Sequence, residues 1–233
     1  MKRAMSKELL DEGEIDLQEL ERSLREVWHV NRYLGGNPAL FRHLGKMLAD
    51  PRAADRGGIR LLDVAAGIGD IPLALLRWRK MNGLDVTISC IDIHPGMVEL
   101  AARRTASSDK ITAMVADATA MPFEDDSFDI AFCNLALHHM DEEQAVQLIR
   151  ELDRVSRIGW VVTDLERRRL AYWSAMLLAG VVWRSPVTKH DGPLSVRRSY
   201  TAAEARELLN RAGIEGAVVR RHFPFRLALV RHG

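Results

Sequence analysis

Cysteine is scarce in this sequence. Only Cys90 and Cys133 occur among its 233 residues, and each lies inside an apolar run. Two isolated thiols make neither a disulfide framework nor a metal site, which needs several ligands at close spacing. We therefore expect both cysteines to be small core residues of a protein in a reducing compartment, the cytoplasm, and we predict no bound metal.

Net charge and long apolar runs are lacking as well. The formal charge is only +1, whereas a domain that binds a phosphate backbone is usually clearly basic. The arginine clusters at 167–169, 197–198 and 220–221 are interpreted as solvated faces. The amino terminus has no apolar signal-peptide core, and the longest apolar stretch, 170–183, is too short to cross a bilayer. Neither nucleic-acid binding nor stable membrane insertion is expected.

Two periodicities divide the chain. Over residues 1–56 apolar residues recur at helical spacing, interrupted at 35–38, which predicts a helical cap whose second helix covers 39–49. From 57 to 233 short apolar runs alternate with helical segments, which predicts an α/β domain with a mostly parallel sheet and helices on both faces. The expected strands are 59–64, 86–91, 111–115, 129–134 and 160–163, and the expected helices between them are 73–80, 95–104 and 142–156.

The last third departs from this alternation. We expect a helical insertion on the substrate side at about 165–199, in which 165–183 is a helix and the remainder is irregular. Thr201 and Glu204 form a capping box for the next helix, which Gly213 ends. The other elements expected are that helix at 202–212 and an antiparallel hairpin at the sheet edge, with strands at 217–222 and 226–230.

A glycine loop between the first strand and its helix is the most informative segment. Asp63 lies near the end of the strand, and Gly67 and Gly69 follow it. Glycine permits unusual dihedral angles and leaves room for a ligand to lie against the backbone. Asp70 is placed to cap the next helix and Gly83 to end it. Such a loop alone could also be a simple strand–helix turn.

Acidic residues end the next two strands. Asp92 follows Gly69 by 23 residues, a position from which a carboxylate can bind both hydroxyls of a ribose. Asp117 ends the third strand and could accept a hydrogen bond from an adenine amino group. Because parallel strands bring their carboxyl ends to one edge, we expect these acids and the glycine loop to lie together. Either acid alone could instead be a helix cap or a turn residue.

These motifs resemble those of class I S-adenosylmethionine-dependent methyltransferases. The first motif of that family, Asp/Glu-x-Gly-x-Gly-x-Gly, matches residues 63–69, and residues 126–139 resemble its fourth-strand motif and the continuation of that motif. The resemblance covers 59–164 strongly and the last third weakly. It implies a Rossmann-like fold with a seven-stranded, mostly parallel sheet, and S-adenosylmethionine as cofactor. The cofactor-binding residues expected are Asp63, Ala65, Gly67, Gly69, Asp92, Ile93, Met97, Asp117, Ala118, Asn134 and Leu135, with Arg32 as a partner for the cofactor carboxylate.

Ala65 stands where the family has its first glycine. We expect this position to keep a negative φ, which alanine adopts readily. The same variant is familiar in the quinone-biosynthesis branch of the family. It therefore favours an acceptor that is a hydroxylated aromatic or a quinone-like molecule.

The leading hypothesis is methylation of a small aromatic hydroxyl, on a quinone- or polyketide-like acceptor of secondary metabolism, by a monomer or homodimer. A dinucleotide dehydrogenase is disfavoured, because Pro72 stands where its third glycine belongs. An RNA or protein methyltransferase on the same fold stays open, although the charge is near neutral and Asn134 does not begin an Asn/Asp-Pro-Pro-Tyr-type tetrapeptide. A non-catalytic S-adenosylmethionine-binding protein stays open too.

Three histidines are candidates for a catalytic base. His138 and His139 follow the fourth strand at the ligand edge, and His190 precedes the penultimate helix. A base is optional, since the sulfonium is already an excellent leaving group, but it would help a phenol whose pKa is about 10. The pair at 138–139 could equally be a structural loop motif. An apolar lid over the acceptor is expected from Trp28, Tyr33, Tyr172, Trp173, Met176, Leu177 and Trp183, although core packing would explain these residues equally well.

Overall fold

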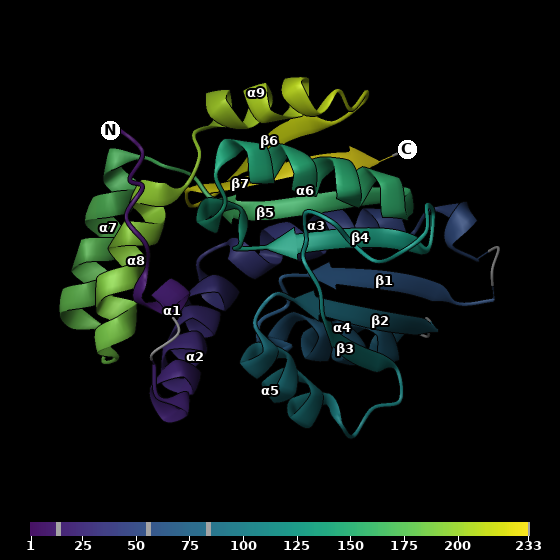
Figure 1. The fold of residues 1–233 in the computed structure, drawn as a ribbon, viewed down its shortest axis with the longest axis horizontal. Coiled ribbons are helices and arrows are strands. Elements are labelled where there is room, and N and C mark those ends of the chain that lie inside the picture. The colour runs from purple at the N-terminus through teal and green to yellow at the C-terminus, as the bar shows by residue number, and fades with distance from the viewer. Residues whose placement is uncertain (13–14, 55–56, 83–84, 233) are drawn as a thin grey trace.

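The protein is an α/β structure built on a mixed sheet. The computed structural model describes residues 1–12, 15–54, 57–82 and 85–232. These residues form a seven-stranded sheet in the order β3-β2-β1-β4-β5-β7-β6, in which β7 runs antiparallel to both neighbours and the other pairs are parallel (Figure 1). The predicted fold class is confirmed. The strands are β1 (Ile59–Val64), β2 (Val86–Asp92), β3 (Ile111–Val115), β4 (Phe128–Asn134), β5 (Ser156–Leu165), β6 (Val218–His222) and β7 (Arg226–His232).

Helices cover both faces of the sheet. On one face α6 (Glu142–Val155) and α9 (Ala202–Ala212) pack on side chains of the central strands, and on the other face α3 (Gly36–Leu48) and α4 (Asp70–Asn82) do so. The helix α5 (Pro95–Thr105) contacts β2 and β3. The central strands are buried along nearly their whole length, which explains their continuous apolar runs.

The remaining helices gather beyond the carboxyl ends of the parallel strands (Figure 1). They are α1 (Leu9–Glu12) and α2 (Leu17–Tyr33) from the amino terminus, and α7 (Arg169–Val181) and α8 (Pro186–Arg198) from the insertion. Helix α8 contacts α1, α2 and α7. A buried hydrogen bond of 3.0 Å from the Thr188 hydroxyl to that of Ser23 joins α8 to α2. The amino terminus and the insertion therefore build one helical wall over the strand ends.

The segment 184–199 was expected to be irregular, and this expectation is wrong. It is mostly the helix α8, whose first turn Ser185 caps by accepting a hydrogen bond from the Thr188 amide. Gly192 and Pro193 suggest a break, yet each fits within the helix. A Cβ on Gly192 would lie 2.3 Å from the Trp183 ring, so glycine is needed there for that ring to pack. Pro193 removes one helical hydrogen bond without ending the helix.

Several local predictions can be compared with the structure. The capping box of Thr201 and Glu204, the αL glycine at 213 and the hairpin β6–β7 at the sheet edge are confirmed. The insertion helix begins only at Arg169, because β5 continues to Leu165. Asp70 is the first residue of α4 and pairs with Arg104 on α5. Gly83 lies outside the described residues.

Both cysteines are buried in the core, Cys133 on one face of the sheet and Cys90 on the other. Within the described part of the chain, no helix is both long enough and apolar enough to cross a membrane.

Candidate functional site

The loop from β1 to α4 takes three residues through the left-handed region. The φ angles are +57° at Ala65, +54° at Gly67 and +78° at Gly69. The expected negative φ at Ala65 is therefore wrong. The Ala66 amide donates to the Ile91 carbonyl at 3.0 Å, which ties the loop to β2 and holds the backbone in this turn despite the alanine side chain.

Non-glycine residues with a strained, positive φ occur at two neighbouring strand ends. Ala65 follows β1, and Leu135, with φ +59°, follows β4, the strand paired with β1. A non-glycine residue in this region costs about 1–3 kcal/mol and persists only where its surroundings enforce it. Leu135 is held by its amide, which donates to the Thr163 carbonyl at 2.8 Å. Both strained residues line the same cavity, as is common at functional sites.

The carboxylate of Asp92 organises the glycine loop. One of its oxygens accepts a hydrogen bond of 2.9 Å from the Gly67 amide, and the other accepts one of 3.0 Å from the His94 amide. A Cβ on Gly67 would meet no atom within 4 Å, so the loop presents an open backbone surface at this point. The loop is thus fixed in position by the residue that the sequence assigns to a ribose.

Asp117 lies in the next loop along the same edge. The Ala116 amide donates to the Asp92 carbonyl at 3.1 Å, so the loops after β2 and β3 are neighbours. The exposed side chain of Asp117 accepts hydrogen bonds from the amide and hydroxyl of Thr119. The glycine loop, Asp92 and Asp117 therefore share one edge of the sheet, although neither acid lines the large cavity described below.

Asp63 is a buried acid that lines the cavity. Its side chain is 2% exposed, and its Oδ2 atom has no hydrogen-bond partner among the described residues. Burial, together with the nearby charge of Asp92, raises the pKa of Asp63 well above its usual range. A buried carboxylate without a partner is costly, so Asp63 is suited to bind a ligand that brings a donor or a positive charge.

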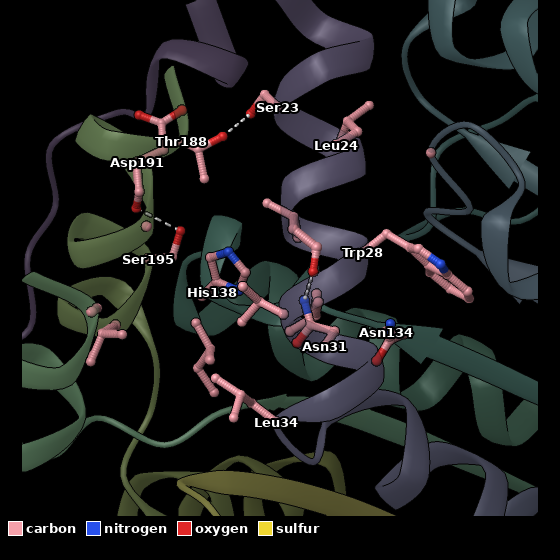
Figure 2. Close-up of a pocket in the computed structure, with 18 of the residues that line it drawn as sticks. Ser23, Leu24, Trp28, Asn31, Leu34, Asn134, His138, Thr188, Asp191 and Ser195 are labelled. Atoms are coloured by element: carbon pink, nitrogen blue, oxygen red, sulfur yellow. Dashed lines mark hydrogen bonds between the residues drawn. The ribbon is translucent and has the colours of Figure 1, made fainter. Parts of the chain in front are cut away.

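A cavity of about 500 Å³ joins the glycine loop to the helical wall (Figure 2). This volume is within the usual range for a small-molecule site. At one end the cavity is lined by backbone and side chains of 65–68 and by Asn134. Trp28 of α2 lies beside Asn134, at the glycine-loop end (Figure 2). At the other end the wall of the cavity is largely apolar. The apolar wall comprises Leu24 and Val27 of α2, Ala171, Ala175, Leu177 and Leu178 of α7, and Trp183.

The predicted lid residues divide into two groups. Trp28, Leu177 and Trp183 line the cavity. The others do not: Trp173, Met176 and Tyr33 are exposed, and Tyr172 packs against the small core of α7 and α8. The sequence pattern identified the correct helices but could not tell which side of α7 faces inward.

Two further buried side chains offer polar atoms to the cavity. The indole Nε1 of Trp183 and both amide atoms of Asn37 have no hydrogen-bond partner in the described part of the chain. Both residues line the cavity. With Asp63, they give a mainly apolar site a few polar groups, the pattern that orients small ligands.

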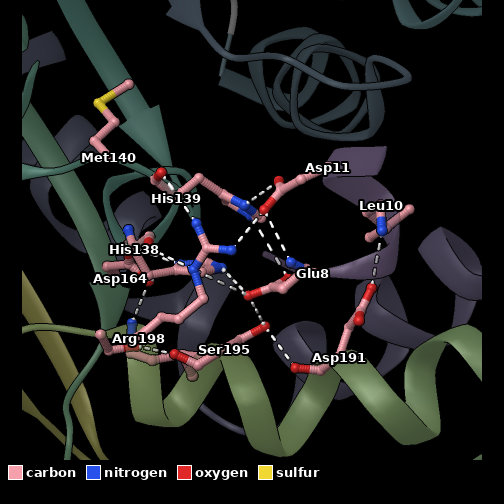
Figure 3. Close-up of polar contacts among 12 residues, drawn as sticks. Glu8, Leu10, Asp11, His138, His139, Met140, Asp164, Asp191, Ser195 and Arg198 are labelled. Carbon is pink, nitrogen blue, oxygen red and sulfur yellow. Dashed lines mark hydrogen bonds and ion pairs between the residues drawn. The ribbon is translucent and has the colours of Figure 1, made fainter. Parts of the chain in front are cut away.

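His138 and His139 lie on the short helix η2 (Leu137–His139), directly after β4, and both line the cavity. The Nδ1 atom of His138 lies 2.8 Å from Oδ1 of Asp164, and the Nδ1 atom of His139 lies 2.7 Å from Oδ1 of Asp11 (Figure 3). An ionised carboxylate accepts only, so each histidine donates from Nδ1; in the neutral imidazole the free lone pair is then on Nε2.

Glu8 faces both histidines from the amino-terminal segment. Its carboxylate oxygens lie 3.8 Å from Nε2 of His138 and 3.9 Å from Nε2 of His139. Glu8 is 1% exposed and lines the cavity. Burial raises its pKa to about 7. The sequence analysis missed Glu8 because a glutamate in a polar amino-terminal segment has no pattern that predicts burial.

The amino-terminal segment is anchored to α8. The amides of Leu9 and Leu10 donate to the Asp191 carboxylate at 2.9 and 3.1 Å. Arg198 donates to Oδ2 of Asp11 at 2.5 Å, and the Ser195 hydroxyl donates to Oε1 of Glu8 at 2.9 Å. These contacts close one side of the cavity with a segment far from it in sequence.

Two predicted site residues lie away from the cavity. His190 is half-exposed on α8, pairs with Asp191 and does not line the cavity. Arg32 is exposed, stacks over the Tyr33 ring and does not line it either. The structure therefore gives neither residue a contact with the site. Of the remaining cofactor candidates, Ile93 is exposed beside Asp92, Met97 lies half-buried in the first turn of α5, and Ala118 packs on the core.

Comparisons with known proteins find a methyltransferase domain in the middle of the chain. Residues 61–159 match the family model described as "Methyltransferase domain". A demethylmenaquinone methyltransferase of Staphylococcus aureus (strain MRSA252) is 32% identical over 111 residues, which are 48% of this chain and 44% of that protein. The chain thus spans less than half the length of the curated relatives it matches.

Solved structures show the same fold. A SAM-dependent methyltransferase from Aquifex aeolicus superposes with a TM-score of 0.53 at 19% identity, over 79% of this chain and 94% of that one. The trans-methyltransferase CalH, in complex with SAH, gives 0.53 at 20% identity, over 76% of this chain and 52% of that one.

Proposed function

We propose that this chain, whose residues 61–159 form a class I S-adenosylmethionine-dependent methyltransferase domain, methylates a small, largely apolar acceptor. The observation that carries the proposal is that one cavity of about 500 Å³ is lined by both the glycine loop and the helical wall. One cavity of this kind can hold the reactive end of the cofactor and the acceptor side by side.

The cofactor is proposed to lie along the edge formed by β1, β2 and β3. Asp92 accepts the ribose hydroxyls while it holds the Gly67 amide, since each carboxylate oxygen has two lone pairs. Exposed Ile93 offers an apolar surface to the adenine, and Asp117 accepts from its amino group. The methionyl part enters the cavity past Gly67, where the unpartnered Oδ2 of Asp63 can accept from its ammonium group.

The acceptor is proposed to lie between the methyl group and the apolar wall. Flat rings suit a wall that includes the indole of Trp183, whose unpartnered N–H can bind an acceptor oxygen. The distant relative named for demethylmenaquinone favours a quinone-like or phenolic acceptor, as Ala65 does. Cytoplasmic location, absence of nucleic-acid binding, and a monomer or homodimer stay predictions.

The transfer is an in-line displacement. A lone pair of the acceptor attacks the methyl carbon as the carbon–sulfur bond breaks, and that electron pair stays on sulfur, which becomes a neutral thioether. The acceptor then loses its proton. Because the leaving group is good, catalysis comes mainly from holding the two reactants collinear and close. The lining residues from the glycine loop, α2 and α7 supply that constraint.

The test is S-adenosylhomocysteine formation by the purified chain with a panel of naphthoquinols, catechols and polyketide phenols, against non-aromatic alcohols, RNA and protein substrates. We expect turnover with aromatic acceptors alone. Ala175→Leu, which extends a side chain into the acceptor end, should lower kcat/KM for the largest acceptors and leave cofactor affinity unchanged. Cofactor binding with no turnover above the acceptor-free rate would favour the non-catalytic alternative, and transfer to RNA or protein would refute the small-molecule assignment.

A further inference from the structure

Glu8, His138 and His139 form a cluster that the methyl transfer described above does not require. One ligand-type atom from each of the three lies within 4.8 Å of the other two. The histidine rings are neighbours, with centroids 4.2 Å apart, and each Nε2 points toward a different oxygen of Glu8 (Figure 3). We propose that these three side chains bind one divalent first-row transition metal ion, with open coordination positions facing the cavity.

The hydrogen-bond chemistry of the cluster supports a cation. Both Nδ1 atoms donate to carboxylates, so the ring atoms that remain to face Glu8 are the two Nε2 atoms. Their separations of 3.8 and 3.9 Å from the Glu8 oxygens are too long for hydrogen bonds. Ligand atoms around a tetrahedral zinc-like ion at about 2.1 Å lie about 3.4 Å apart, so each of the two histidine–Glu8 separations would shorten by about half an ångström on binding.

The groups behind the histidines have the arrangement of a metal site. A metal-bound histidine almost always donates its second ring N–H to a carboxylate or carbonyl, which fixes the ring and raises its basicity as a ligand. Here His138 donates to Asp164, and His139 donates to Asp11. Asp164 is itself held, since it also accepts from the His138 amide at 2.8 Å. Both rings are thus positioned before any ligand arrives.

The local charge also favours a divalent ion. Four carboxylates lie in or directly around the cluster, against the guanidinium groups of Arg198 and Arg226. Carboxyl groups therefore outnumber guanidinium groups around the cluster. Two imidazoles and one carboxylate suit zinc, iron(II), cobalt(II) or manganese(II) better than calcium or magnesium. The four carboxylates belong to Glu8, Asp11, Asp164 and Asp191.

The position of the cluster suggests what the ion would do. All three ligands line the cavity, so its open positions face the proposed acceptor. This part of the inference rests on the proposed function: an acceptor with two adjacent oxygen donors, such as a catechol or a hydroxyquinone, would chelate the ion and be oriented by it. His138 and His139 would then act as metal ligands, and not as the general bases considered from the sequence.

Cobalt(II) titration of the full chain tests the site. The protein, without a histidine tag, is stripped with a chelator and titrated in the absence of cofactor, with visible absorption and calorimetry as readouts. We expect saturation at one equivalent. Glu8→Gln, which keeps the side-chain shape, should weaken binding by more than tenfold. Asp11→Asn neutralises the partner of His139, which also accepts from Arg198, and should weaken binding by about 10–100-fold. The control His190→Gln changes a histidine outside the cavity and should bind as the wild type does.

Two results would overturn the metal assignment: no saturable band at one equivalent, or equal affinity in the wild type and Glu8→Gln. Either would make the cluster a hydrogen-bonded anchor for the amino terminus. Circular dichroism and S-adenosylhomocysteine calorimetry on the same samples separate the possible failures. Variants that keep their fold and bind the nucleoside but not cobalt localise the defect to the cluster, whereas loss of nucleoside binding by the wild type would count against the proposed function alone.

Discussion

Asp92→Ala removes one carboxylate that is proposed to serve both the loop and the cofactor. In the structure this group accepts hydrogen bonds from the Gly67 and His94 amides at 2.9 and 3.0 Å. With cofactor bound, it would accept two more from the ribose. A hydrogen bond to a charged group contributes about 1.5–3 kcal/mol, so losing the two ribose bonds costs about 3–6 kcal/mol. At about 1.4 kcal/mol per tenfold, the affinity should fall by two to four orders of magnitude.

Asp92→Ala should also lower the free energy of unfolding, by less than it lowers the free energy of cofactor binding. Water can reach the loop and replace part of the hydrogen bonds that the Gly67 and His94 amides lose. The remaining loss of stability is about 2 kcal/mol, or roughly 4–8 °C in Tm for a chain of this size. Asp92→Asn keeps one acceptor and should give intermediate values for affinity and Tm. Calorimetry with S-adenosylhomocysteine and thermal unfolding measure both quantities. If Asp92→Ala loses stability yet binds the nucleoside within threefold of the wild type, Asp92 only holds the loop and the ribose assignment is wrong.

Three further changes test other parts of the site. Because the pKa of Asp63 is raised in the folded state, its ionisation destabilises the fold increasingly as pH rises from the ordinary value of about 3.9 toward the folded pKa. Asp63→Asn should therefore raise Tm at pH 8, and the difference in Tm from the wild type should shrink toward pH 4. The same variant should bind the cofactor more weakly. A Tm difference that grows on acidification would contradict this reasoning. Ala65→Gly relieves a positive φ and should stabilise the protein by about 0.5 kcal/mol in urea unfolding, and a loss above about 1 kcal/mol would count against strain at this position. Gly192→Ala displaces Trp183 and should cost about 1–3 kcal/mol and lower kcat/KM with cofactor affinity unchanged; unchanged stability and turnover would show that the ring is free to move.

The gathering of Asp63, Gly67 and Asp92 at one sheet edge, where we propose the cofactor binds, could be predicted because its determinants are local in sequence. Asp63, Gly67 and Asp92 each lie at or just after a strand, and parallel strands bring such positions to one edge whatever the rest of the chain does. The capped helix that begins after Thr201 was predictable for the same reason, since the capping box lies within four residues. The φ of Ala65 was not predictable, because it is imposed by the contact of this loop with β2.

The acceptor side depends on contacts between distant segments. Glu8 meets His138 across 130 residues of sequence, and nothing in its own neighbourhood marks it as buried. His190, by contrast, has an acidic neighbour that suggests catalysis, but α8 turns its ring outward and presents Asp191 and Ser195 inward. The helix α8 itself was missed because Gly192 and Pro193 are usually helix breakers, and the packing of Trp183 that favours glycine is a tertiary contact.

The most direct test of the central claim is a crystal structure with S-adenosylhomocysteine bound. The account predicts that the ribose lies on Asp92 and that the sulfur enters the cavity beside Gly67 and Asn134, facing the apolar wall and the two cavity-lining histidines. A nucleoside bound at another edge, or a sulfur that points away from this cavity, would contradict it.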